Sequence, residues 1–344
     1  MSLTVRQYAQ SDRTAWDAFV ERHPRGTVLH LSAWGRCMAA TFGYGDRSMI
    51  AEENGEIRAV LPLFLVENLL QGRVLVSSPF AVYGGVLALD DVSRDEIGEA
   101  VRRLGRELRV KHIEIRNSWE EQRLGFHPID RYATFTQAVR PQDGESLQAE
   151  LPKKTRNMVK KALKSAFSAR ITRDLDAFYA LLSDTYHRLG TPVFSRKHFQ
   201  KLLDEFGPHA DAREILLEDK VVAVSFNFLW RGEMHTYYAA SDQNYLNLAP
   251  NNFLYYDHIL WAGENGCHTF DFGRSKYDTG NMEFKRHWST VMRALPYEIL
   301  LVERKELPDF TPKNENFSLA IRAWQKLPLP LTKVLGPPIV KMFP

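Results

Sequence analysis

The chain has 344 residues, and at roughly 150 residues per domain this length favours two domains. Its 44% hydrophobic and 25% charged residues are typical of a soluble globular protein, while 20 Gly and 17 Pro exclude a fibrous or low-complexity chain. The formal net charge of +3 means that any anion binding must come from local clustering. Cys37 and Cys267 alone exclude a disulfide framework. We expect a cytoplasmic protein, because the polar N-terminus lacks a signal-peptide pattern and the apolar run 59–66 is too short to span a bilayer.

The first half is expected to alternate helices with β-strands. Ser11-Asp12 and Ser32 suit the N-caps of two helices, and Ser93 with Glu96 forms the capping-box pattern of a third. Asn54-Gly55 is a strong hairpin signal between two β-rich runs. The expected elements are helices at 11–23, 32–42 and 93–108 and strands at 48–52, 57–66, 73–77, 112–116 and 132–139.

The second half repeats this order of elements. It is expected to contain helices at 174–189, 195–206 and 252–264 and strands at 212–217, 221–229, 234–240, 269–272 and 294–302. The two hairpins align by residue type at a constant offset, as in Ile57 with Val221 and Val60 with Val224. We therefore predict an α/β (α+β) fold made of a duplicated unit with mixed, mostly antiparallel sheets. A single irregular domain is the alternative.

Composition also indicates the domain boundaries. We expect a first domain at 1–142, a second at 143–312 and a tail at 313–344, with Gly144 and its polar neighbours as the linker. Residues 316–344 contain five Pro, four Lys or Arg and no acid, so we do not expect a core element there. The prolines limit the tail to two short helices, which either lie on an anionic inner-membrane surface or pack on the first domain.

The segment 152–167 predicts a basic amphipathic helix at the start of the second domain. Six Lys or Arg lie between positions 153 and 164 with no acid among them. One helical face carries Lys153, Arg156, Lys160 and Lys164, and the opposite face is apolar. Such a face suits a phosphate-bearing partner, namely tRNA, a nucleotide-linked precursor or coenzyme A. A solvated surface helix is the alternative.

The residues that could carry chemistry lie in the aromatic-rich stretch 237–288. No P-loop, dinucleotide-binding, nucleophile-elbow, HExxH or CxxC motif is present, so we expect no metal and no permanently bound cofactor. Asp271, Asp278 and Lys285 lie among flexible glycines and could hold one ammonium group in a cleft. Asn252 begins a helix whose free N–H groups suit a phosphate or carboxylate. The aromatic residues equally suit a core, and Asp271 equally suits a turn cap.

Three of these segments resemble a known family. The basic segment KKTRNMVKKALKSAF, the segment YYAASDQNYLNLAPNNFLYYDHILWAGENGCHTFDFG and the EFK run after it resemble the FemAB family. The duplicated unit resembles tandem domains of the GCN5-related N-acetyltransferase (GNAT) type. FemAB enzymes transfer aminoacyl groups from aminoacyl-tRNA to amines of peptidoglycan precursors. The similarity is greatest to a branch found with exopolysaccharide and PEP-CTERM/exosortase systems, and it includes PFAVYGGV at 79–86.

The resemblance implies roles for individual residues of the second half. Lys285, in the pair Phe284-Lys285, corresponds to a lysine at the catalytic centre. The basic helix corresponds to a phosphate-binding region near the domain interface, through Arg156, Lys160 and Lys164. Tyrosines of the acceptor groove correspond to Tyr237 and Tyr238, and Tyr83 in the matching segment 79–86 is a further candidate for substrate binding.

Two departures from related patterns leave the acyl donor open. The helical arm that is linked to tRNA contact in some FemAB members is missing, and so is the loop by which acetyltransferases hold the coenzyme A pyrophosphate. The donor is therefore either aminoacyl-tRNA or an acyl-CoA or acyl carrier.

We expect an N-acyltransferase or aminoacyltransferase that acts on an amine of a cell-envelope or exopolysaccharide precursor. Lys285 would stabilise the oxyanion formed by amine attack, and Asp271, Asp278 or the substrate itself would take the proton. An acyl-CoA- or acyl-carrier-dependent N-acyltransferase is one alternative. A catalytically silent module that binds anionic glycan or nucleic acid through the basic helix is the other.

Overall fold

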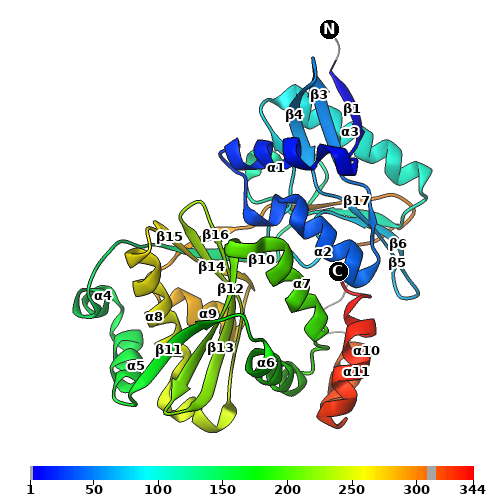
Figure 1. Cartoon of the computed structure of the whole chain (residues 1–344). Helices are drawn as coiled ribbons and strands as arrows, with labels where there is room; N and C mark the ends of the chain where they lie inside the picture. Colours follow the sequence, from blue (N-terminus) through cyan, green and yellow to red (C-terminus); the bar gives the residue numbers. More distant parts are fainter. Residues whose placement is uncertain (1–2, 308–314) are drawn as a thin grey trace. The chain divides into compact units, whose positions relative to one another are not determined.

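The computed structural model shown in Figure 1 describes residues 3–307 and 315–344. The chain forms two compact units. Unit 1 comprises residues 1–131, 295–311 and 338–344, and unit 2 comprises residues 132–294 and 312–337.

Unit 1 contains two sheets, with strand orders β1-β3-β4-β7 and β2-β5-β6-β8-β17-β9. Its core includes Leu75, Ile97, Val101 and Ile113, none of which is exposed. The helices are α1 (Arg13–Arg22), α2 (Ser32–Phe42) and α3 (Asp91–Glu107). The strands are β1 (Thr4–Gln7), β2 (Gly45–Asp46), β3 (Met49–Glu53), β4 (Glu56–Leu61), β5 (Phe64–Asn68), β6 (Gly72–Val76), β7 (Leu87–Ala88), β8 (His112–Ile115), β9 (His127–Ile129) and β17 (Tyr297–Leu301).

Unit 2 contains one sheet, with the order β11-β12-β13-β14-β15-β10-β16. The strands are β10 (Tyr132–Ala138), β11 (Phe167–Thr172), β12 (Ala210–Leu217), β13 (Lys220–Trp230), β14 (Glu233–Ser241), β15 (Thr269–Lys276) and β16 (Val291–Ala294). The helices are α4 (Gly144–Glu150), α5 (Lys153–Leu163), α6 (Asp176–Leu189), α7 (Arg196–Phe206), α8 (Pro250–Glu264), α9 (Gly280–Arg286), α10 (Glu315–Gln325) and α11 (Leu329–Val340).

Helices cover both faces of the unit 2 sheet. Neighbouring residues of a strand point to opposite faces, and on β13 the hydroxyl of Ser225 lies 2.7 Å from Nε2 of His258 on α8, whereas Phe226 packs against Phe178 on α6. The sheet is therefore enclosed between α8 on one side and α6 with α7 on the other, an arrangement that can be followed in Figure 1.

The predicted fold class is confirmed. The sheet β1-β3-β4-β7 is antiparallel, and the other two sheets are mixed and mostly antiparallel, with one parallel strand pair each in the described residues: β6 with β8 in unit 1 and β14 with β15 in unit 2. Many predicted elements are present with nearly the expected bounds. For example, Ser195 caps α7 by accepting a hydrogen bond from the backbone N–H of His198 at 3.2 Å.

The closing strands are arranged differently from the simple tandem order. The strand expected at 132–139 was to complete the first half, but the observed strand β10 pairs with β15 and β16 of unit 2. The expected strand 294–302 is divided at Pro296, and its second part, β17, pairs with β8 and β9 of unit 1. Proline has no N–H to donate to a sheet, so the break falls at this residue.

Three local expectations also differ from the structure. The expected strand 57–66 is divided at Pro62 into β4 and β5, which belong to different sheets. The linker around Gly144 is the helix α4, because the carboxylate of Asp143 caps its N-terminus. The N-cap of α3 is Asp90, not Ser93, whose backbone N–H donates to the Asp90 carboxylate at 2.8 Å.

The tail forms two short helices, as its prolines predicted. In unit 2, α10 packs on α6, and the backbone carbonyl of Leu327 lies 2.9 Å from Nε2 of His187. In unit 1, Tyr44 donates to the carbonyl of Lys341 at 2.6 Å and Arg116 donates to that of Pro344 at 2.8 Å. These contacts favour a structural role for the tail over the membrane alternative.

Candidate functional site

The sheet of unit 2 opens between its two parallel strands. Residues 233–235 of β14 pair with residues 269–271 of β15, and the pairing ends at His235 and Asp271. Beyond this point β14 continues along β13, and β15 continues along β10. The two strands therefore stop pairing with each other next to His235 and Asp271, and the sheet opens there.

Asp271 anchors a cluster of buried polar groups at this opening. Its side chain is nearly inaccessible, and it accepts hydrogen bonds from the backbone N–H of Gly273 at 2.6 Å and from the hydroxyl of Thr134 at 3.4 Å. Its other oxygen lies 3.6 Å from Nδ1 of His235. Gly273 has a φ of +72°, and a Cβ at this position would lie 2.9 Å from Nε2 of His235, so the close approach requires glycine.

Lys285 reaches the same cluster from α9. Thr279 caps this helix by accepting a hydrogen bond from the backbone N–H of Met282. The Lys285 side chain is buried, and its amine donates to the carbonyl oxygens of Gly273 at 3.0 Å and Arg274 at 2.9 Å. Burial lowers the pKa of Lys285 to about 8, while the carboxylate of Asp271 opposes this shift. Two of the three predicted catalytic residues are thus brought together.

His235 also belongs to this cluster, although no sequence pattern indicates it. Burial lowers its pKa, an effect that Lys285 reinforces and Asp271 opposes, so the imidazole is neutral at pH 7. A lone histidine on a strand has no recognisable spacing, and its pairing with Asp271 depends on the parallel register of β14 and β15. A neutral imidazole beside a carboxylate is able to accept a proton.

Asp278, the third predicted catalytic residue, lies outside this cluster. It is exposed in the turn between β15 and α9, with a positive φ of 58°. Asn252 lies in the first turn of α8, and its backbone N–H donates to the carbonyl of Ala249 at 3.0 Å. This N–H is therefore already used within the chain.

The aromatic candidates divide between the opening and the core. Tyr237 is half-buried and lies on β14 two residues after His235, the last residue of β14 that pairs with β15. The ring centroids of Tyr237 and His235 are 4.9 Å apart. Tyr238 is buried against Phe199 and Phe226. Phe284 packs on Tyr255 in the core of unit 2. Tyr237 is the one of these three that is positioned beside the polar cluster.

The basic helix is α5, which is shorter than predicted. It ends at Leu163 because Ala166 takes a positive φ of 50° and Phe167 begins β11. The hydroxyl of Thr155 donates to the carbonyl of His287, which follows α9, so α5 is held next to the helix that carries Lys285. The buried face is Thr155, Val159 and Ala162.

The cations of α5 are available to an anion. Its exposed lysines, including Lys160, and Lys164 directly after it, form no ion pair with any residue in the described part of the chain. Arg156 is only half-exposed, and its guanidinium donates to the carbonyl of Leu151 at 3.0 Å. Lys160 and Lys164 are therefore better placed than Arg156 to contact a ligand.

In unit 1 the end of the matching parallel pair is closed by the chain itself. The backbone N–H of Gly84 donates to the carbonyl of Arg116, just after β8, at 2.9 Å. The Arg116 guanidinium donates to the carbonyls of Ser78 and Ala81 at 3.3 and 3.2 Å. A Cβ at Gly84 would lie 2.4 Å from the side chain of Ser78, so this packing requires glycine. The segment 79–86 is therefore held against the end of β8 in unit 1, and Tyr83 within it is buried.

Two further observations concern the described residues as a whole. They contain no group of three or more His, Cys, Asp or Glu that is arranged to hold a metal ion. In residues 3–307 and 315–344, none of the helices has the length and apolar character needed to cross a bilayer.

Two units, each with a mixed sheet that contains one parallel pair, define a tandem GNAT-like fold. Residues 153–286, which contain α5 and the whole polar cluster except Thr134, match the family described as acetyltransferase (GNAT) domain. The chain is 24% identical over an alignment of 373 positions to lipid II:glycine glycyltransferase of Staphylococcus epidermidis, covering 80% of this chain and 88% of that protein. These similarities identify an enzyme of the acyltransferase class and support the resemblance to FemAB-type proteins.

Solved structures share the fold over most of the chain. The crystal structure of FemX has a TM-score of 0.67 at 16% identity, covering 87% of this chain and 98% of FemX. A tandem GNAT protein from the clavulanic acid biosynthesis pathway has a TM-score of 0.54 at 11% identity, covering 87% of this chain and 98% of that protein. Both comparisons support the arrangement of two GNAT-like units.

Proposed function

We propose that this enzyme transfers an aminoacyl group to an amine of a phosphate-bearing cell-envelope precursor, and that the reaction takes place at the opening between β14 and β15. The observation that carries the proposal is the buried cluster of Lys285, Asp271 and His235 at that opening. The relative that transfers glycine to lipid II supports the choice of an aminoacyl group and a cell-wall acceptor.

The cluster supplies the two functions that such a transfer needs. The acceptor amine attacks the carbonyl carbon of an ester, a C–N bond forms, and negative charge develops on the carbonyl oxygen. The buried ammonium of Lys285 stabilises this charge in a water-poor site. The C–O bond to the donor then breaks, and the leaving oxygen takes a proton.

His235 provides a route for that proton. The attacking amine loses one proton as the amide forms, and the neutral imidazole accepts it and returns it to the leaving oxygen. Asp271, 3.6 Å from Nδ1, holds the ring in position and stabilises its charged form. With a thioester donor the same steps apply, and a C–S bond breaks in place of the C–O bond.

The lysines of the basic helix would bind phosphate. Lys160 and Lys164 are exposed and have no acidic partner in the described residues, and α5 is held to the end of α9. The phosphate belongs to the precursor or to a tRNA donor; a coenzyme A donor is the alternative, which the GNAT domain match favours. Tyr237 would contact the acceptor beside the cluster.

The proposal extends to the cellular system in which the acceptor is made. The sequence resemblance to the exosortase-associated FemAB branch supports an acceptor in exopolysaccharide or PEP-CTERM systems. A lipid-linked acceptor would bring the enzyme to the inner face of the membrane. Mass spectrometry of RNA and small molecules that co-purify with the protein would identify the donor.

Replacing Lys285 by Met tests the assignment of the reaction centre. This change removes the charge at similar side-chain volume, and the loss of one oxyanion partner typically lowers kcat by about 100-fold or more. The matched control is Lys276→Met, which removes an exposed lysine from the end of β15. Turnover of the identified substrate by Lys285→Met at the rate of the control would contradict the proposal. If the protein were a silent binding module, loss of Lys285 would leave ligand binding through α5 unchanged and no turnover would be found for any donor.

A further inference from the structure

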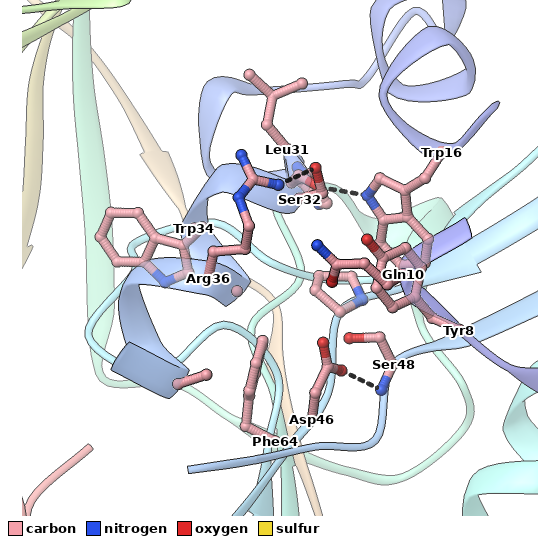
Figure 2. A pocket seen from close by; sticks show the side chains of 14 residues that line it. Tyr8, Gln10, Trp16, Leu31, Ser32, Trp34, Arg36, Asp46, Ser48 and Phe64 are labelled. Atoms are coloured by element: carbon pink, nitrogen blue, oxygen red, sulfur yellow. Dashed lines mark hydrogen bonds between the residues drawn. The ribbon is translucent and has the colours of Figure 1, made fainter. Parts of the chain in front are cut away.

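Unit 1 contains a cavity of about 170 Å³ that is separate from the cluster of unit 2. Its walls come from the segment after β1, from α1 and α2, and from the strands that follow α2. Figure 2 shows Ser32 and Arg36 of α2 at one side of the cavity and Asp46 with Ser48 at the other. The residues that line the cavity include Tyr8, Trp16, Trp34, Arg36, Asp46 and Phe64.

The aromatic walls of the cavity present carbon surfaces. The indole N–H of Trp16 donates to the backbone carbonyl of His30 at 2.8 Å, and that of Trp34 donates to the carbonyl of Pro79 at 3.0 Å. Tyr8 packs edge-on against Trp16, with ring centroids 5.2 Å apart. Since the indole N–H of Trp16 already has a backbone partner, its ring would contact a ligand through its face and edge. The faces of aromatic rings attract cations.

Asp46 supplies a carboxylate to this aromatic surface. One of its oxygens accepts the backbone N–H of Ser48 at 2.8 Å. The carboxylate is half-buried and forms no ion pair with a basic side chain in the described residues. Burial raises its pKa, while hydrogen bonds from Ser48 and the charge of Arg47 lower it, and the Arg47 guanidinium itself donates to the backbone carbonyl of Asp46 at 2.7 Å. A carboxylate that is partly removed from water gains from a ligand that brings a positive charge to its oxygens.

Arg36 is the cation that shares the cavity wall, and its charge is directed elsewhere. Its guanidinium donates to the hydroxyl of Ser32 at 2.8 Å, and that hydroxyl donates to the carboxylate of Asp17 at 2.7 Å. The pKa of Tyr8 is raised by burial and further by Asp46, Asp17 and Asp12, while Arg36 opposes this. Among these charged groups, Asp46 has the largest effect on the Tyr8 hydroxyl.

Space remains between α2 and the carboxylate. Gly35 faces the cavity, and a Cβ at this position would lie 3.7 Å from the second oxygen of Asp46 and 3.2 Å from the ring of Phe64. The small residue at this turn of the helix keeps the route to the carboxylate open. A side chain here would narrow it.

We propose that this cavity is a binding site for a small primary ammonium group, which the carboxylate of Asp46 pairs with and the rings of Tyr8, Trp16 and Phe64 surround. The site lies wholly within unit 1, so the inference stands independently of the reaction proposed for unit 2. Its size restricts the occupant to a short alkylammonium, either a free amine or the amine-bearing end of a longer molecule.

Calorimetric titration of the full chain with n-propylammonium chloride tests this site. We expect saturable binding, while 1-propanol and sodium propionate at the same ionic strength do not bind. Titration with an N-terminally blocked lysine amide distinguishes the two sources, because a longer molecule is accepted only if the cavity receives its amine end. Binding of 1-propanol as tight as that of propylammonium would overturn the assignment of a cation site.

Substitutions identify the residue responsible. Asp46→Asn keeps the acceptor for Ser48 and removes the charge, so propylammonium binding should weaken at least about tenfold. Asp91→Asn, at an exposed acid on α3, is the matched control and should bind as the unchanged protein does. If Asp46→Asn does not fold, Gly35→Ala decides the matter, because its methyl group narrows the cavity within a helix. Unchanged affinity in the folded Asp46→Asn protein, or in Gly35→Ala where it serves as the test, would overturn the proposal.

Discussion

Burial of Lys285 makes the stability of this protein depend on pH in a defined direction. Its pKa is about 8 in the folded state against 10.5 for an unperturbed lysine. Between these values the unfolded chain binds more protons than the folded one, so stability rises with pH. Below pH 8 both states carry the charge, and the cost of burying it is fully present.

The corresponding prediction compares the protein with Lys285→Met. The free energy of unfolding of the lysine form, minus that of the methionine form, should rise by about 3 kcal/mol between pH 7.5 and pH 10.5. Urea denaturation at several pH values measures this difference, and other titrating groups cancel in the subtraction. A difference that is flat across this range would show that Lys285 is not held as a buried ammonium.

His235 should control the acidic side of the pH–rate profile. As a proton acceptor it must be neutral, so kcat/KM should fall as the pH drops through its lowered pKa, below 6.5. His235→Gln should lower kcat and remove this acidic limb. His127→Gln, at an exposed histidine of unit 1, is the control and should keep the limb. An acidic limb that persists in His235→Gln would assign the proton transfer to another group.

The residues of the polar cluster show how much of a site can be predicted from sequence. Lys285 and Asp271 were selected because they lie among glycines in one short stretch of chain and because the resemblance points to Lys285. His235 lies on another strand, and its proximity to Asp271 follows from the parallel register of β14 and β15, which no local pattern encodes. Asp278 shares the local stretch, but the turn that contains it directs it to solvent.

At the scale of elements, the basic helix should affect binding and not the chemical step. Replacing Arg156, Lys160 and Lys164 together by Gln should weaken a phosphate-bearing ligand and reduce the salt dependence of its affinity. Most of the effect should come from Lys160 and Lys164, because Arg156 also contacts the carbonyl of Leu151. Affinity measured between 50 and 300 mM salt gives both quantities.

The control for this variant is a matched change on another helix. Arg103, Arg106 and Arg109 lie on or just after α3 in unit 1 and are exposed. Their joint replacement by Gln removes the same charge from the protein, and it should leave the affinity and its salt dependence unchanged. Equal weakening by both triple variants would mean that net charge, not α5, governs binding.

Element positions were predictable where one local rule decides them. Cap and turn residues predicted the bounds of α7 and of the hairpin of β12 and β13 to within a few residues. The pairing partners of β10 and β17 were not predictable, since each strand reads as the end of its own half and the exchange depends on contacts that are distant in sequence. Pro62 and Pro296 mark the two divided strands, and proline inside a β-rich run is the signal that would have indicated them.

At the scale of the whole molecule, the C-terminal tail connects local packing to stability. Trp324 is 8% exposed and Thr332 is 2% exposed, so parts of both tail helices are buried. Gln325 donates to the carbonyl of Arg188 in unit 2 at 2.6 Å, and Gln71 donates to that of Met342 in unit 1 at 2.6 Å. Each unit therefore gains contacts from its own part of the tail.

Removal of residues 316–344 should consequently destabilise the protein. Burial of one large apolar side chain contributes roughly 1.5–3 kcal/mol, and hydrogen bonds in both units are lost as well. We expect the thermal midpoint to fall by at least about 5 °C, measured by differential scanning calorimetry. Vesicle flotation provides the opposing test, because Leu319 and Val334 are 59% and 70% exposed and could contact lipid. Two results together would contradict this prediction: the truncated protein keeps its thermal midpoint, and only the full-length chain floats with anionic vesicles. The tail would then be a membrane-binding element and not a structural one.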